Sequence, residues 1–444
     1  MTSWTQLETR GVRPHVMAFL AGYVVLLYAV PSRLVVGPLG SAGAPSMLVG
    51  LVSILGWVLY QLSRKPEDDW RLQDLRVRPV RVALGAFCVC VGISFVVAML
   101  RPIDGDEVSP ASVAILALAS WSGTMLVTHD MIPSRRRLET LTALLAWSGG
   151  VLAILGVIQF VTGQLWIDRI TIPGLTATQL GNSFSRAGFA RPVGTATHPI
   201  EYGVLLAMLL PFTLYWALHG TSRSRACRWL PALAMAAVMP LTSSRSAYIG
   251  ATVCLVVLSI GWPTARRRAL LVSVVGLGVV MFAAVPGLIG TIRGLFLNSG
   301  TDPSVASRTA SYGTAMAFIE KAPFFGRGLG TFLPRYRILD NEYLLLLVTV
   351  GVAGTLAFLA LIGTAVATLI RARRRSADPA TRDLALSIVA AVVSGTVSLA
   401  LFDAFAFPMT MGTLFLIFGM AGALDRLIPL RQPVLGTRTA DRRV

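Results

Sequence analysis

Long apolar runs separated by short polar segments follow one another along most of the chain. A helix that crosses the hydrocarbon core of a bilayer needs about 20 predominantly apolar residues. On this pattern we predict about twelve transmembrane helices, over residues 15–30, 45–62, 80–100, 110–127, 141–161, 199–218, 229–241, 246–262, 269–289, 343–370, 384–401 and 405–424. The runs are continuous rather than alternating, which excludes a transmembrane β-barrel. The predicted fold is therefore all-α, a polytopic integral membrane protein with a single membrane domain over residues 1–444.

The composition changes this picture in one respect, the orientation. The chain is 55% hydrophobic and 14% charged, whereas soluble domains contain about 25% charged residues. Its formal net charge is +18, but the basic residues stand in short clusters between apolar runs, so we exclude a nucleic-acid partner. Most clusters fall in loops on one side of the predicted membrane. Because cytoplasmic loops carry the excess of Lys and Arg, both termini are predicted to be cytoplasmic.

Two long loops then lie on the external side, at residues 162–198 and 290–342, and we expect them to carry short helices such as one over 311–321. Loops of this length in a compact protein are usually functional or disordered, and the aromatic and apolar residues in these loops argue against disorder. The external segment DGDE (104–107) is expected to be a solvated turn. No cleavage site for a signal peptide follows the first apolar run, so we predict an uncleaved first helix.

The residue pattern offers no metal or nucleotide site. The four cysteines lack a zinc spacing. The glycine-rich segment GRGLG (326–330) has no strand before it and lacks the spacing of a nucleotide-binding loop. We therefore predict no metal and no cofactor. We expect segment 326–330 to form a tight turn in which the backbone approaches another part of the protein closely.

Arg245 stands between two apolar runs, in the segment LTSSRSA (241–247). A guanidinium stays charged at physiological pH, so beside lipid it needs an anion, a carbonyl or a water-filled cavity. The short run 229–241 is interpreted as a half-helix that meets its neighbour at this arginine. Other arginines predicted on the external side are Arg186, Arg191, Arg308, Arg327, Arg335 and Arg337. The planar guanidinium suits phosphate oxygens, which favours an anionic substrate. The alternative is solvated loop charges or contacts with lipid headgroups.

External carboxylates are fewer than external arginines. Asp340 precedes the predicted span 343–370, where a carboxylate can accept a proton from a hydroxyl. Alternatively Asp340 caps the helix. Arg335 and Arg337 are candidates to pair with Asp340 and keep it ionised. His198 stands at another predicted helix start, where capping is again the alternative to substrate binding.

Three segments together resemble the O-antigen ligase family, which includes lipopolysaccharide O-antigen ligases, polysaccharide polymerases and related protein-glycosylating enzymes. The first is RPVGTATHP (191–199), similar to the family's R-x-x-G-T-x-x-H-P entry to a central helix. The second, 241–247, is similar to T-x-S-R-x-A/G. The third begins at Ser307-Arg308, continues through PFFGRGLGTF (323–332), and ends in DNEYL (340–344) and GVAG (351–354). The resemblance covers a catalytic core of about residues 162–370.

The resemblance implies an inverting, metal-independent glycosyltransferase with its site outside the bacterial cytoplasmic membrane. The implied donor is a glycan on a polyprenyl diphosphate. By motif position, Arg245 and Arg308 would bind the diphosphate and stabilise it as it leaves. Asp340 occupies the place where lipopolysaccharide ligases carry a histidine thought to activate the acceptor hydroxyl, and this departure counts against transfer to a lipid A core. Further predicted substrate-binding residues are Arg186, Arg191, His198, Arg327, Arg335, Arg337 and Asn341.

The predicted partners are this lipid-linked donor, a glycan, lipid or protein acceptor, and membrane lipid. The main alternative is a transporter or flippase of lipid-linked glycans, since about twelve helices and an interior arginine fit that function too. Transporters often show two similar halves, and this sequence has no evident internal repeat. A membrane scaffold without substrate would leave Arg245 unexplained.

Overall fold

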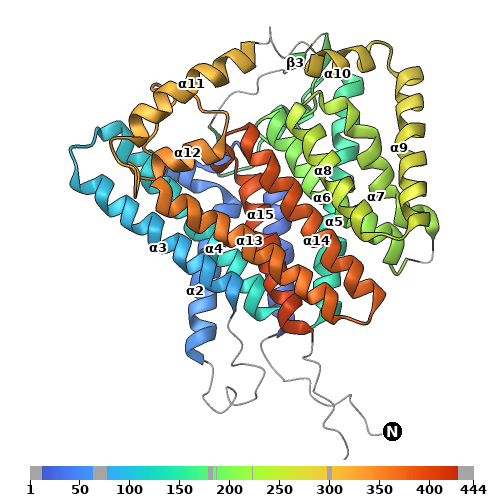
Figure 1. The fold of residues 1–444 in the computed structure, drawn as a ribbon, viewed down its shortest axis with the longest axis horizontal. Coiled ribbons are helices and arrows are strands. Elements are labelled where there is room, and N and C mark those ends of the chain that lie inside the picture. The colour runs from blue at the N-terminus through green and yellow to red at the C-terminus, as the bar shows by residue number, and fades with distance from the viewer. Residues whose placement is uncertain are drawn as a thin grey trace, which may run out of the picture.

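A computed structural model describes residues 13–63, 78–178, 184–186, 188–222, 224–297 and 303–428. The helices are α1 (Arg13–Ala29), α2 (Pro45–Ser63), α3 (Pro79–Leu100), α4 (Gly105–Met131), α5 (Arg135–Thr162), α6 (Pro199–His219), α7 (Arg225–Val238), α8 (Arg245–Gly261), α9 (Thr264–Ala284), α10 (Leu288–Leu297), α11 (Pro303–Ile319), α12 (Glu342–Thr349), α13 (Gly351–Arg375), α14 (Pro379–Ser398) and α15 (Pro408–Leu427). The fold is all-α and rich in apolar helices, as predicted (Figure 1).

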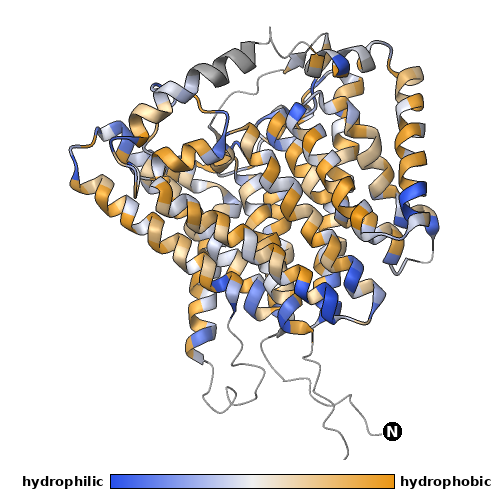
Figure 2. Ribbon diagram, in the orientation of Figure 1, coloured by the Kyte–Doolittle hydropathy of each residue, from blue (hydrophilic) through white to orange (hydrophobic). Residues whose placement is uncertain are grey.

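Three helices form the centre of the molecule. Most of the residues of α6, α14 and α15 are buried, and α14 packs against α6, α8, α13 and α15. The second half of α4 packs on α15 and is buried as well. In contrast, α9 has no buried residue and lies at the edge of the bundle in Figure 1. Apolar residues cover the middle of the bundle and hydrophilic residues gather at its ends (Figure 2).

Nine helices in the described part of the chain are long and apolar enough to cross a membrane, and His15–Ala29 and Arg245–Gly261 are shorter apolar helices. These helices match the predicted runs closely, whereas the total of about twelve spans stays a prediction. One predicted span is wrong in its continuity. The run 343–370 is divided into α12 and α13 by Gly351, which has φ +65°. The run 229–241 is also interrupted: α7 ends at Val238 and the 3-10 helix η4 (Pro240–Thr242) follows.

The long loops 162–198 and 290–342 lie at the same end of the bundle. The first contains the 3-10 helix η3 (Trp166–Arg169) and strands β2 (Leu175–Ala177), β3 (Ser185–Arg186) and β4 (Phe189–Ala190). Strand β2 pairs antiparallel with β1 (Leu34–Val36), and β3 pairs with β4. The second loop contains the end of α10 and all of α11, which begins earlier than the predicted helix 311–321. We call this the loop-bearing end; it is uppermost in Figure 1.

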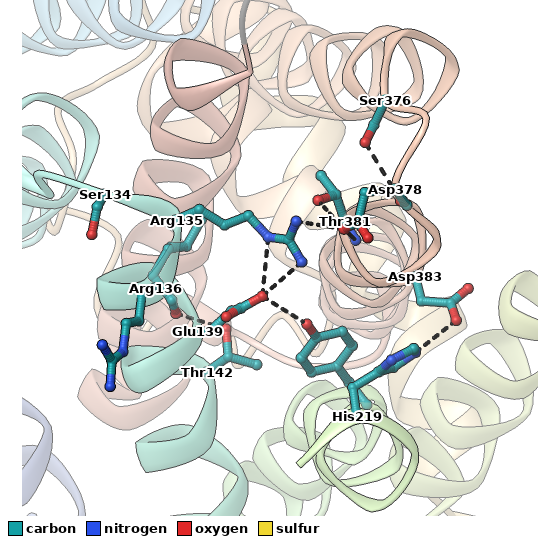
Figure 3. Close-up of polar contacts among 12 residues, drawn as sticks. Ser134, Arg135, Arg136, Glu139, Thr142, His219, Ser376, Asp378, Thr381 and Asp383 are labelled. Carbon is teal, nitrogen blue, oxygen red and sulfur yellow. Dashed lines mark hydrogen bonds and ion pairs between the residues drawn. The ribbon is translucent and has the colours of Figure 1, made fainter. Parts of the chain in front are cut away.

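Ion pairs tie the helices together at the opposite end, which carries the basic clusters. Arg135 on α5 contacts Glu139 at 2.9 Å and also pairs with Asp378 before α14. Asp383 on α14 accepts a hydrogen bond from Arg266 on α9, 2.6 Å away, and pairs with His219 at the end of α6 (2.8 Å). Figure 3 shows these groups converging from α5, α6 and α14. Arg135 and Arg266 thus pair with structural carboxylates, so these two arginines need no further ligand to explain them.

Candidate functional site

A cavity of about 810 Å³ opens at the loop-bearing end. Its walls come from the α1–α2 connection, with the 3-10 helix η1 (Gly37–Gly43), and from α4 and the starts of α6 and α12. The α14–α15 connection, with η5 (Leu399–Leu401) and η6 (Ala404–Ala406), closes it. The lining contains many hydroxyl and aromatic side chains, and among the described residues its imidazole and carboxyl groups are His198, Glu342 and Asp403. A volume in the range of about 300–1,000 Å³ with a few placed polar groups is typical of a ligand pocket.

His198 is both a helix cap and part of the cavity wall. Its Nδ1 accepts a hydrogen bond from the Ile200 amide, 3.1 Å away, so the capping alternative is confirmed. The ring meets Phe184 edge-on, with centroids 4.8 Å apart. Burial, reinforced by the positive charge of Arg191, lowers the pKa of His198 to about 4. The imidazole is therefore neutral at physiological pH, and with Nδ1 accepting, Nε2 carries the proton.

The segment that contains Arg191 is held tightly in place. The Gln159 side chain on α5 accepts hydrogen bonds from the amides of Val193 and Gly194 and donates one to the Gly194 carbonyl. Thr195 donates to the Tyr28 carbonyl at 2.6 Å. The guanidinium of Arg191 in turn donates from Nε to the Thr242 carbonyl, 3.3 Å away. The first two sequence motifs, far apart along the chain, thus meet in space.

Arg245 is the first residue of α8 and is half-buried. The chain reaches it through Ser243, which has φ +46°, a conformation that a non-glycine residue adopts only when its surroundings enforce it. Tight packing supplies that enforcement: Ala247 lies so close to Gly203 on α6 that a side chain there would clash, and Ser244 is also in contact with this position. The Tyr248 hydroxyl also donates to the Pro240 carbonyl at 2.6 Å. Arg245 therefore lies at a tightly packed junction between η4, which follows α7, and the start of α8.

Two predicted site residues cannot be placed at side-chain level. Arg186 lies in β3 and Arg308 lies in α11, but both side chains are outside the described residues. The predicted diphosphate clamp of Arg245 and Arg308 therefore remains a prediction.

Three carboxyl groups gather where α12 begins. Glu342 is fully buried, and its Oε2 accepts a hydrogen bond from the Phe405 amide at 3.0 Å. Burial, together with the charge of Asp403, raises the pKa of Glu342 to about 8. Burial and the charge of Asp340 raise the pKa of Asp403 to about 6. Glu342 and Asp403 line the cavity, and Asp340 is close enough to influence Asp403 electrostatically.

The cap of α12 is Asn341 rather than Asp340. Its side-chain oxygen accepts hydrogen bonds from the amides of Tyr343 at 3.1 Å and Leu344 at 3.3 Å. The capping alternative for Asp340 is therefore wrong, because the neighbouring residue already satisfies these amides. The oxygen of Asn341 is likewise committed to the backbone, so only its amide NH₂ group is left for the substrate contact predicted from the motif.

The arginines of the second loop are directed mainly at other residues. Arg327 contacts Glu107 at 2.6 Å and stacks over the ring of Phe318. Glu107 is buried in the first turn of α4 and accepts a hydrogen bond from Arg327, so the expected solvated turn at 104–107 is wrong at this residue. Arg335 pairs with Asp104 at 2.7 Å and with Asp106 at 3.0 Å, and not with Asp340 as expected from sequence. These pairs fasten the loop to the α3–α4 connection.

Arg337, in contrast, contacts α11. Its Nε donates to the Ser311 hydroxyl on α11 at 3.0 Å. Ser311 is buried, so Arg337 links the loop to a buried position on α11.

The glycine-rich segment forms the predicted turn, and the part that it approaches is the break between α12 and α13. The amide of Arg327 donates to the Val348 carbonyl at 3.1 Å and that of Gly328 to the Thr349 carbonyl at 2.8 Å. Gly326 has φ +64°, and any side chain on it would collide with Thr349. A side chain on Gly351 would collide with Phe324 in the same way. This mutual packing fixes the end of α12 and the break before α13.

Glu201 is a structural residue whose role sequence reasoning missed. It is fully buried on α6; one oxygen accepts from the amide and hydroxyl of Thr197, each at 3.0 Å, and the other accepts from the Met409 amide at 2.9 Å. It fixes the start of α6 to the start of α15. An available signal was its place three residues after the cap His198, where an acidic residue often completes a capping motif.

Taken together, the fold and the site define a class: a multi-pass helical membrane protein with a built polar cavity and conformationally fixed arginines at one end. A comparison with protein families identifies the class further. The model of the family described as O-antigen ligase matches residues 230–359, from α7 into α13, and this match supports the assignment of the chain to the O-antigen ligase family. The match contains the second and third sequence motifs. No curated protein matches the chain significantly.

The family match supports an O-antigen ligase-type membrane glycosyltransferase, and so a glycosyl-transferring enzyme of polysaccharide biosynthesis. Together with the apolar helices it indicates a multi-pass protein of the bacterial inner membrane. A lipid-linked glycan donor and a glycan acceptor follow from the family in general terms.

Proposed function

We propose that the protein transfers a glycan from a polyprenyl-diphosphate carrier to an acceptor hydroxyl at its loop-bearing end, facing the outside of the inner membrane. The observation that carries this proposal is the convergence of the motifs. Arg191 contacts Thr242, next to the junction that presents Arg245. His198, from the same segment as Arg191, lines one cavity with Glu342 from the third motif. Cationic and acidic groups thus flank one site, as the two substrates require.

The reaction assigns different work to the two kinds of group. The acceptor oxygen attacks the anomeric carbon of the donor sugar, the bond from this carbon to the diphosphate oxygen breaks, and the diphosphate leaves with the bonding electrons. Its growing negative charge is stabilised by fixed guanidinium groups, for which we propose Arg245 and Arg308, with Arg191 nearby. A diphosphate is a good leaving group, so protonation by a general acid is not required. Attack from the opposite side of the sugar inverts the anomeric centre.

The acceptor hydroxyl loses its proton to a carboxylate, for which we propose Asp340. It holds the place of the activating residue in the third motif, and the capping role that competed for it belongs to Asn341. Its charge raises the pKa of Asp403, a residue of the cavity lining, which supports a position near the cavity. No step of this scheme uses a metal or a nucleotide, because the energy of transfer is stored in the lipid-linked donor.

Purified protein in lipid nanodiscs provides the test. Incubated with a defined polyprenyl-diphosphate glycan and an acceptor, it should release polyprenyl diphosphate in step with glycan transfer. Arg245→Ala and Arg308→Ala should each lower turnover by on the order of 100- to 1000-fold. Arg→Lys should restore little, because an ammonium cannot reproduce the bidentate fork. Arg136→Ala, an exposed arginine at the opposite end, is the matched control and should keep wild-type turnover.

The outcomes separate the proposal from its rival. Wild-type turnover in both the Arg245 and Arg308 variants would contradict the proposal that these arginines bind the diphosphate. Movement of labelled donor lipid between leaflets without any release of polyprenyl diphosphate would instead identify a flippase.

A further inference from the structure

The cavity at the loop-bearing end is acidic, which sets it apart from the rest of this basic chain. Among the described residues, its lining contains Glu342 and Asp403 but no arginine or lysine. The chain as a whole carries 39 basic residues against 21 acidic ones. A phosphate or carboxylate placed in this cavity would lose its hydration and meet the negative charge of Asp403, which is unfavourable. The donor diphosphate therefore belongs outside this cavity, toward the arginines.

Two buried polar atoms in the cavity wall have no hydrogen-bond partner among the described residues. They are Oε1 of Glu342 and Oγ of Ser120, which belong to α12 and α4. Leaving such groups unsatisfied is unfavourable, so buried polar atoms normally have partners. Both side chains are almost entirely buried, with Glu342 0% and Ser120 1% exposed. The Ser120 Oγ lies against Gly50 on α2, so Oε1 of Glu342 is the atom that a ligand hydroxyl in the cavity would satisfy.

Aromatic rings supply the other half of the lining. Trp121 and Phe405 meet edge-on with centroids 5.7 Å apart, and Phe184 and Phe407 flank the His198 ring. All five side chains line the cavity. Apolar ring faces combined with a few hydrogen-bonding groups suit a sugar, whose ring presents C–H faces and whose edge presents hydroxyls.

We propose that this cavity binds the terminal sugars of the acceptor glycan, that these sugars carry no phosphate or carboxylate, and that Glu342 hydrogen-bonds an acceptor hydroxyl through Oε1. This inference refines the proposed function and rests on it, because a sugar bound in the cavity is an acceptor only if the protein transfers a glycan. The donor glycan is a second source of the same chemistry. We assign the acceptor because the cavity holds the carboxyl groups, whereas the first donor sugar must stay joined to the diphosphate beside the arginines.

The protonation of Glu342 fits this role. Its raised pKa, to about 8, leaves the carboxyl group largely protonated at neutral pH. A protonated carboxyl can both donate and accept a hydrogen bond, as a sugar hydroxyl can. Glu342 therefore acts as a binding residue that positions the hydroxyl, while the proton is removed by the proposed base Asp340.

A binding experiment without donor tests the inference directly. The purified protein in nanodiscs is applied to an array of immobilised uncharged oligosaccharides and of their counterparts in which one terminal sugar is a uronic acid. We expect binding to at least one uncharged member and at least about 10-fold weaker binding to its uronic acid counterpart. Equal or tighter binding of the uronic acid forms, or no binding of any uncharged member, would overturn the inference.

Variants then assign the binding to the cavity. Glu342→Ala should weaken binding of the uncharged oligosaccharide at least about 10-fold. Glu342→Gln, which keeps a donor and an acceptor, should bind nearly as wild type does and shows that the site still folds. Glu320→Ala, an exposed glutamate at the end of α11, is the matched control. Wild-type affinity in Glu342→Ala would contradict the role of Oε1.

A positive charge added to the cavity lining tests whether the acidity of the cavity sets its preference for uncharged sugars. Ser41 lines the cavity and is exposed, so lysine can be accommodated there. Ser41→Lys should narrow or reverse the discrimination against uronic acid sugars. Ser112→Lys, at an exposed position on α4 that is not part of the lining, should leave discrimination unchanged. An unchanged preference in Ser41→Lys would show that the acidity of the cavity does not select the ligand.

Competition with donor separates the two sources of glycan. A polyprenyl-diphosphate disaccharide should leave oligosaccharide binding intact if the cavity holds the acceptor. Complete competition would assign the cavity to the donor glycan and overturn the inference while leaving the proposed transfer reaction standing. Oligosaccharide binding in a protein that performs no transfer would overturn the proposed reaction while leaving a sugar-binding cavity standing.

Discussion

At the residue scale, the neighbouring side chains of Asp340 and Asn341 have different roles at the start of α12, although either could cap the helix by sequence alone. Asn341 caps the helix through its side-chain oxygen, which leaves Asp340 without a capping role. The next residue, Glu342, is turned into the cavity wall and is fully buried. Three consecutive polar residues thus face three environments, and their chemistry differs accordingly.

We predict that Asp340→Asn keeps the fold but loses transfer. Asparagine has nearly the shape of aspartate and the cap is supplied by Asn341, so thermal stability and donor binding should stay within error of wild type. A general base contributes about 100- to 10,000-fold, and transfer should fall accordingly. Asp340→His should retain measurable transfer. Full activity in Asp340→Asn would shift the role of base to another carboxyl group or to the leaving diphosphate.

The stability of the protein should depend on pH through Glu342. Its pKa is about 8 in the folded protein against 4.5 for the unperturbed group. The folded state therefore holds a proton that the unfolded state releases, so the stabilisation is present below pH 4.5 and is lost as the pH rises through about 8. We expect the Tm to fall between pH 5 and pH 8.5, by more than about 2 °C.

Comparison with Glu342→Gln isolates the contribution of this residue to the pH dependence. The variant cannot ionise, so its Tm should fall less over the same pH range, while Glu320→Gln, an exposed control, should follow wild type. Identical pH curves for wild type and Glu342→Gln would mean that other groups, Asp403 among them, carry the effect.

At the element scale, interruptions of helices build the site. The break at Gly351 separates α12 from α13, and the turn at Gly326 packs into that break. The interruption between α7 and α8 similarly forms the junction at Ser243 and Arg245. A continuous helix would satisfy its own backbone and leave no end to carry polar groups, so the site depends on where each helix stops.

Gly351→Ala should destabilise the protein and lower transfer. Alanine is strained at φ +65°, and its methyl group would collide with Phe324, so we expect a cost above about 1 kcal/mol and a lower Tm. Gly363→Ala lies in the same helix, in open space, and should be neutral or stabilising by about 0.5–1 kcal/mol. Thermal unfolding of both variants checks this. A Gly351→Ala protein as stable as Gly363→Ala would show that the break does not need glycine.

At the scale of the whole molecule, the two ends differ in kind. At one end, Asp378 and Asp383 pair with Arg135, Arg266 and His219 and tie α5, α6, α9 and α14 together. The loop-bearing end carries the cavity and the arginine junction. The direction of the chain across the membrane therefore decides which compartment the proposed reaction occurs in.

We predict that the loop-bearing end is external. Cytoplasmic loops of membrane proteins carry the excess of Lys and Arg, so the basic clusters at the opposite end should lie in the cytoplasm. Tyr312→Cys on α11 should be labelled by an impermeant thiol reagent in intact cells, and Arg137→Cys at the start of α5 only after lysis; both positions are exposed. The native cysteines are first replaced to remove background. The opposite labelling pattern would reverse the orientation and place the proposed site in the cytoplasm.

The hydrophobic pattern by itself determined the helices, since lipid offers the backbone no partner and each span must satisfy itself locally. It also located the arginine junction, because a charge between two apolar runs stands out in one dimension. What it did not determine was which polar groups meet. The pairing of Arg327 with Glu107, the burial of Glu342 beside Asp403, and the contact of Arg191 with Thr242 all join residues distant in sequence.

Adjacent residues were equally undetermined: whether Asp340 or Asn341 caps α12 depends on the residue at which the helix starts. In the structure α12 starts at Glu342, and the Asn341 side chain accepts hydrogen bonds from the first amides of the helix. Side-chain type and local pattern thus specify which chemistry is available. The tertiary contacts decide which groups are buried, which are neutralised and which are left facing the cavity, because burial and neighbouring charge are properties of the folded chain alone.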